Sequence, residues 1–78
     1  MTLAERVRAA AQLPSPADRR RIRNQAKVSL AEMAAELKVT PVTVLRWEQG
    51  AFEPRRDRAI AYRDLLEALQ DATAGTAA

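Results

Sequence analysis

Residues 41–49, PVTVLRWEQ, contain the side chains whose types and spacing best suit recognition of another molecule. In a helix that turns 100° per residue, one arc carries Val42, Leu45, Arg46 and Gln49. An arginine can donate two hydrogen bonds to a guanine edge, a glutamine can pair with an adenine edge, and aliphatic side chains pack on thymine methyl groups. This arc therefore predicts a helix that reads base edges in double-stranded DNA.

The opposite arc of the same helix holds Val44, Trp47 and Glu48, which are expected to face the protein interior. Thr40 suits the N-cap position, and Gly50 suits the left-handed residue that often ends a helix. The sequence therefore predicts a short helix over 41–49 with one packed face and one free face.

A second short helix is predicted directly before this one. Ser29 and Glu32 have the spacing of a capping box, and Lys38 with Val39 forms the turn between the two helices. Its apolar face consists of Leu30, Met33, Ala34 and Leu37. Two helices joined by a tight turn can present the second helix to the DNA major groove.

Three further helices are expected, over 3–12, 16–26 and 56–72, with a frayed tail over 73–78. The last helix has an apolar stripe at helical spacing, formed by Tyr62, Leu65, Leu66 and Leu69. Such a stripe either closes the core or binds a partner chain.

The sequence also gives expectations for an arginine-rich run and for an aromatic residue in a loop. The arginine-rich run over 19–23 is interpreted mainly as a solvated face, which could also reach phosphates. Phe52, in the loop after residue 50, is expected to pack against the core.

Composition limits the functions that the chain can have. It contains no cysteine and no histidine, which removes disulfides, thiolate metal sites and the most common general base. It also has no phosphate-binding glycine loop, so we expect no enzyme, cofactor or metal site. No apolar run approaches the roughly 18 residues of a membrane span, which predicts a soluble, cytoplasmic protein.

The charge is unevenly distributed along the chain. Residues 14–63 hold eleven Lys and Arg against six Asp and Glu, a net +5, whereas Asp64, Glu67 and Asp71 give the C-terminal end −3. A basic body with an acidic end suits a polyanionic partner.

The spacing of these residues resembles the phage repressor/Cro-type, or XRE-like, helix-turn-helix family. The resemblance covers about residues 17–55, half of the chain, and its most specific block is RWEQG at 46–50. The matching residues are Arg23, Ser29, Met33, Ala34, Leu37, Val39, Thr40, Val44, Arg46, Trp47, Glu48, Gly50 and Pro54. The resemblance implies that the helix after Ser29 braces the helix over 41–49, which lies in the major groove.

The resemblance also implies roles for individual residues. The base-reading residues would be Pro41, Val42 and Arg46, beside Leu45 and Gln49 of the free arc. The phosphate-binding residues would be Thr40, Thr43 and the arginines after the helix, chiefly Arg55, with Arg56 and Arg58. Arg23 and Glu48 would form a structural ion pair.

The chain departs from the family pattern in three ways, at four positions. Leu30 replaces a glutamine that contacts the DNA backbone, and Lys38 replaces the turn glycine. Lys38 would then adopt a left-handed conformation at a cost of roughly 1 kcal/mol. Pro41 and Val42 replace polar readers, so direct readout is expected to rest heavily on Arg46, with DNA shape supplying further specificity.

Two other functions remain open at this point. A helical protein–protein module, such as an antirepressor or adaptor, would use Val42 and Leu45 as an apolar patch, although Arg46 does not suit that role. An excisionase-like or winged-helix DNA-binding factor would need a β-wing after residue 50, where the sequence shows no alternating strand pattern.

The sequence as a whole predicts an all-α, four- to five-helix, lambda-repressor-like DNA-binding domain over 1–78. It would have an N-terminal helical arm (1–13), a core motif (16–55) and a long C-terminal helix. Because one such unit reads only a few base pairs, we expect a homodimer that regulates transcription by occupying a near-palindromic operator. The dimer surface would be the stripe over 62–69 or the arm, and no small-molecule ligand is evident.

Overall fold

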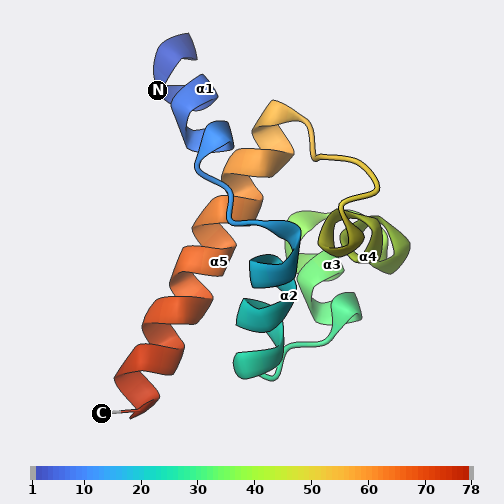
Figure 1. The fold of residues 1–78 in the computed structure, drawn as a ribbon, viewed down its shortest axis with the longest axis vertical. Helices are drawn as coiled ribbons and strands as arrows, with labels where there is room; N and C mark the ends of the chain where they lie inside the picture. The colour runs from blue at the N-terminus through green and yellow to red at the C-terminus, as the bar shows by residue number, and fades with distance from the viewer. Residues whose placement is uncertain (1, 78) are drawn as a thin grey trace.

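Five α-helices make up the computed structural model, which describes residues 2–77 (Figure 1). They are α1 (Leu3–Ala11), α2 (Pro16–Gln25), α3 (Leu30–Leu37), α4 (Pro41–Gln49) and α5 (Arg56–Ala77). No strand occurs within 2–77, so the predicted all-α fold is confirmed, and this range contains no β-wing of the kind that a winged-helix factor needs. α4 has the predicted bounds, and α1 and α2 each end one residue earlier than predicted.

Side-chain caps determine where the three central helices begin. Ser29 Oγ accepts the backbone N–H of Glu32 at 3.0 Å, and Glu32 Oε1 accepts the backbone N–H of Ser29 at 2.9 Å, which completes the predicted capping box. The hydrogen bond from the Ser29 backbone, together with that of its hydroxyl, lowers the pKa of Glu32. Ser15 and Thr40 cap α2 and α4 by accepting backbone N–H groups.

Left-handed residues close the turns that follow these helices. Lys38 ends α3 with φ 57° and ψ 44°, as predicted, and Gly50 ends α4 with φ 72°. A side chain at Gly50 would also contact Pro16, because a Cβ there would lie 3.3 Å from Pro16 Cγ. Lys27, in the turn between α2 and α3, has φ 58°, which the sequence had not suggested.

α5 runs along one side of the molecule, and α2 and α3 pack against it while α4 packs against α2 and α3 (Figure 1). Trp47 of α4 reaches Tyr62 of α5, and their ring centroids lie 5.0 Å apart with the planes at 38°. The other buried members of this core are Ile22, Met33, Ala34, Leu37, Val44 and Leu66. The core therefore lies between α5 and the three short helices.

The apolar stripe of α5 belongs to this core. Tyr62 and Leu66 are 0% and 1% exposed, and Leu65 and Leu69 are partly buried against the same cluster. Of the two roles that the sequence left open for this stripe, core closure and a dimer surface, the structure shows core closure for Tyr62 and Leu66. Helical spacing showed that the stripe needed a cover, but it did not show that α2–α4 of the same chain provide it.

α1 lies beside the N-terminal part of α5, so the predicted arm packs on its own chain (Figure 1). Arg6 forms an ion pair with Asp57 near the start of α5. Gln12, just after α1, accepts a hydrogen bond from Arg63 of α5 with 3.1 Å between Oε1 and Nη1. Polar contacts of Arg6 within α1 and of Gln12 just after it therefore connect this segment to α5.

α5 continues past its predicted end at residue 72 and runs to Ala77. Thr73 Oγ1 donates a hydrogen bond to the carbonyl oxygen of Leu69 at 2.8 Å, within the helix. The sequence predicted a frayed tail over 73–78, whereas the structure describes helix as far as Ala77; residue 78 lies outside the described residues.

Candidate nucleic-acid interface

One face of α4 is buried in the core. Val44, Trp47 and Glu48 are 0%, 2% and 7% exposed, as their shared arc predicted. The packed face fixes the rotation of α4 about its own axis. The direction of its remaining side chains follows from that rotation.

The other face of α4 is open to solvent. Val42 and Leu45 are 53% and 38% exposed, and Arg46 and Gln49 are exposed beside them. The side chains of Arg46 and Gln49 have no hydrogen-bond or ion-pair partner among residues 2–77. Donors and acceptors that their own chain leaves free can bind base edges. Pro41, at the first position of α4, is exposed as well.

Arg23 and Glu48 join α2 to α4 through a two-point ion pair. Arg23 Nε lies 2.6 Å from Glu48 Oε2, and Arg23 Nη2 lies 2.9 Å from Glu48 Oε1. Arg23 Nη1 also donates to the carbonyl oxygen of Val28 at 3.0 Å, so the guanidinium holds the turn before α3. The hydrogen bond to Glu48 raises the pKa of Arg23, although burial opposes this shift. The contact that the resemblance implied is present.

A family model described as helix-turn-helix matches residues 20–68, more than half of the chain. The chain belongs to the XRE-like helix-turn-helix family. No curated protein and no solved structure matches it. The matched residues extend from α2 into α5 and leave α1 outside. A helix-turn-helix domain is a DNA-binding domain, and α3 and α4 are the two helices of its motif in this chain.

Arg19 has a structural role in this helix-turn-helix domain that the sequence interpretation missed. It is 4% exposed, not part of a solvated face. Its Nη1 donates to the carbonyl oxygen of Trp47 at 3.1 Å, and its Nε donates to that of Pro14 at 2.7 Å. The guanidinium also lies 5.9 Å from the ring centroid of Tyr62. Arg19 precedes the inward-facing Ile22 by three residues, and this spacing was the signal that could have identified it.

The loop from α4 to α5 is held through Glu53. Arg19 Nη2 lies 2.8 Å from Glu53 Oε2, and this pair joins the loop to α2. Phe52 is 45% exposed, so the prediction that it packs against the core is wrong. The loop is instead held by the contact of the neighbouring Glu53 with Arg19. Pro54, the next residue, is half-buried.

Two threonine hydroxyls lie together at the N-terminus of α4. Thr40 Oγ1 accepts the backbone N–H of Thr43 at 3.3 Å, and the two hydroxyl oxygens are 2.9 Å apart. The N-terminus of a helix favours negative charge, but Pro41 has no N–H and Thr43 donates its N–H to Thr40, so the threonine hydroxyls are the main groups that α4 offers here. This end of α4 therefore suits the phosphate contact that the resemblance implied for Thr40 and Thr43.

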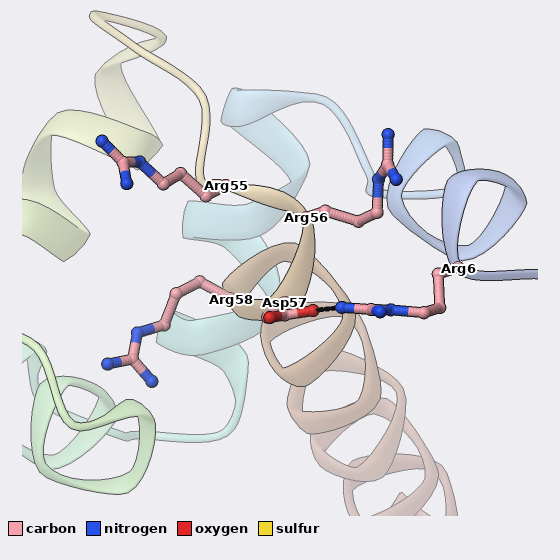
Figure 2. Close-up of a pocket in the computed structure, with 5 residues that line it drawn as sticks. All are labelled: Arg6, Arg55, Arg56, Asp57 and Arg58. Carbon is pink, nitrogen blue, oxygen red and sulfur yellow. Dashed lines mark hydrogen bonds and ion pairs between the residues drawn. The ribbon is translucent and has the colours of Figure 1, made fainter. Parts of the chain in front are cut away.

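The arginines after α4 do not all point the same way. Figure 2 shows that Arg55 extends toward α4 and Arg58, on the same side of the view, toward α3, whereas Arg56 extends toward α1. All three are exposed and have no ion-pair partner among residues 2–77. The predicted set of three phosphate-binding arginines is therefore divided between two sides of the start of α5.

Two further findings concern residues 2–77, one on metal ions and one on membranes. Within 2–77, no three His, Cys, Asp or Glu side chains gather in a way that could hold a metal ion. In the same range, no helix combines the length and apolarity needed to cross a membrane.

Proposed function

We propose that this helix-turn-helix domain is a sequence-specific regulator of transcription that binds double-stranded DNA through α4. The observation that carries the proposal is the free face of α4, on which Arg46 and Gln49 have no partner among residues 2–77. Arg46 would donate to a guanine edge and Gln49 would pair with an adenine. Val42 and Leu45 would contact thymine methyl groups. Pro41 would approach the bases at the N-terminal end of α4.

Phosphate contacts would orient α4 in the groove. Arg55 extends toward α4 and Arg58 toward α3, and both carry charges that no residue of 2–77 neutralises (Figure 2). Thr40 and Thr43 would contact phosphate at the N-terminus of α4. Such contacts fix the register of a protein on the duplex without reading its sequence.

A homodimer on a near-palindromic operator is the second part of the proposal. One domain of this size contacts only a few base pairs, and two-fold symmetric half-sites give the specificity that one unit lacks. The α5 stripe lies in the core, so the exposed apolar edge of α1 is the proposed dimer surface. On it Leu3 and Val7 are 64% and 44% exposed. Repression would follow from operator occupancy, in the bacterial cytoplasm or in a phage-infected cell.

Selection of binding sites from random duplexes tests this function directly. We expect enrichment of one sequence repeated in inverted orientation, with half-site centres about 10 base pairs apart. Enrichment of a single half-site would support sequence-specific DNA binding and would contradict the proposed homodimer. Sedimentation of Val7→Glu beside the wild type then tests the α1 surface, because a buried carboxylate at a dimer interface would dissociate the dimer.

The exposed Val42 and Leu45 also favour a second candidate, a protein–protein module that binds a partner through this apolar patch. The two functions differ in the selection experiment. A module of this kind would enrich no sequence, and its retention on heparin or on random duplexes would be lost with rising salt without any selectivity.

A further inference from the structure

An arginine-rich cleft opens where α1 meets the start of α5 (Figure 2). Its volume is about 580 Å³, and its lining residues are Arg6, Arg55, Arg56, Asp57 and Arg58. Four arginines and one aspartate give it a formal charge of +3. Gathering like charges in a small space raises the local potential and concentrates anions there.

The charges of this cleft are only partly neutralised by the protein. Asp57 is its single carboxylate, and Arg6 forms an ion pair with it. The Arg56 side chain extends toward α1, on one side of the cleft (Figure 2). It has no ion-pair partner among residues 2–77. The Asp57 side chain is 79% exposed, so its charge acts on whatever binds in the cleft. The cleft therefore combines free cations with one exposed carboxylate that Arg6 offsets.

α1 adds this feature to the helix-turn-helix domain. The family match covers residues 20–68 and includes Arg55, Arg56, Asp57 and Arg58, but Arg6 lies outside it. Without α1, Arg6 would not offset the charge of Asp57, and the cleft would attract an anionic ligand less strongly. With α1 in place, the ion pair of Arg6 and Asp57 has no net charge, and Arg56 lies beside it as a cation without an ion-pair partner in the described part of the chain.

We propose that α1 and the start of α5 form a second binding site for the phosphate backbone of DNA, next to the contacts made through α4. The site rests on the proposed DNA-binding function and extends it beyond the matched family domain. Arg56 binds a phosphate group, Asp57 weakens this binding, and Arg6 offsets Asp57. The Arg6–Asp57 pair thereby sets how strongly the cleft holds the duplex.

Opposite effects of two substitutions test this site in the full-length chain. The experiment measures the affinity for a random 20-base-pair duplex as a function of salt concentration. Because each phosphate contact contributes about 0.9 to the slope of log affinity against log salt, Asp57→Asn should raise the affinity at most about eightfold near 0.1 M salt. Arg6→Gln should lower it by a similar factor. The double variant, in which the net charge of the pair is again zero, should bind like the wild type.

The opposite signs separate a charge effect from a loss of structure. Loosening α1 by breaking the ion pair would change both single variants in the same direction. Asp71→Asn is the matched control, since it removes the same charge from the same helix about 21 Å farther along its axis. That distance exceeds the Debye length of about 10 Å at 0.1 M salt, so this control should leave the affinity unchanged.

Three outcomes would overturn the inference. The first two require that the wild type binds duplex DNA. In the first, Asp57→Asn leaves the affinity unchanged, as Asp71→Asn does. In the second, Asp57→Asn and Arg6→Gln both weaken binding. Alternatively, inorganic phosphate could raise the melting temperature of Asp57→Asn above that in chloride at equal ionic strength, without any change in duplex binding. That result would assign the cleft to free phosphate. A wild type that binds no duplex at all would instead refute the proposed function itself.

Discussion

Arg19 and Arg23 lie one turn apart on α2 and bind two successive residues of α4. Arg19 donates to the carbonyl oxygen of Trp47, and Arg23 forms a two-point ion pair with the carboxylate of Glu48. Both guanidinium groups also hold a loop, since Arg19 reaches Glu53 and Arg23 donates to Val28. α2 therefore fixes the C-terminal end of the proposed reading helix.

The ion pair with Glu48 should contribute strongly to stability. In Glu48→Ala, Arg23 keeps a largely buried charge without its carboxylate, so the free energy of unfolding should fall by about 3–5 kcal/mol. Denaturant unfolding measures this change. Arg21→Ala, which removes the exposed pair with Asp18, is the control and should change stability by less than about 1 kcal/mol. Equal effects of the two substitutions would show that the Arg23–Glu48 pair is no more stabilising than a surface pair.

Tyr62→Phe should leave the fold intact and increase its stability. The Tyr62 hydroxyl is buried without a hydrogen-bond partner in the described structure, and burial, followed by the charge of Glu48, raises the pKa of Tyr62. Removing a buried unsatisfied group of this kind should stabilise the protein by about 1 kcal/mol. Calorimetry of both proteins gives the difference in melting temperature. A lower melting temperature for the variant would mean that the hydroxyl has a partner in solution.

Lys38→Gly should also stabilise the domain. Lys38 ends α3 in the left-handed conformation, where a Cβ costs roughly 1 kcal/mol that glycine avoids. Lys38→Ala is the matched control, because it removes the same side chain and keeps the Cβ. Denaturant midpoints should rank glycine above both lysine and alanine. If alanine stabilised the domain as much as glycine, the charged side chain and not the backbone would be the cause.

Arg46→Ala should reduce sequence-specific DNA binding. Loss of a two-point contact with a guanine should cost about 1–3 kcal/mol on the selected operator and little on random DNA. Fluorescence anisotropy on both duplexes measures the two affinities. Arg20→Ala removes the same charge from the exposed surface of α2 and is the control. An equal loss on both duplexes would make Arg46 a phosphate contact.

Arg55→Ala should weaken binding to all duplexes alike. As a phosphate contact, Arg55 should contribute about one unit to the slope of log affinity against log salt, whatever the sequence. Titrations at several salt concentrations, on the operator and on a random duplex, give both slopes. An unchanged slope would place Arg55 outside the interface.

The sequence by itself determined where α3 and α4 begin, where α4 ends, and the division of α4 into two faces. Ser29, Thr40 and Gly50 act through contacts within one turn of the chain, so their effects follow from spacing alone. Val44 and Trp47 faced inward as predicted, because helix geometry fixes which side chains share a face. The pair of Arg23 and Glu48 came from the family resemblance, since no local rule connects residues so far apart in the chain.

Only the tertiary structure decided which chain covers each apolar or charged face. Periodicity identified the α5 stripe, but the short helices of the same molecule, not a partner, bury Tyr62. Arg19 reads as a surface residue until the end of α4 brings a carbonyl oxygen to it, together with Glu53. Likewise, Arg6 meets Asp57 only because α1 folds back on α5. Each of these contacts joins residues distant in the sequence, where packing of whole helices and not local conformation sets the neighbours.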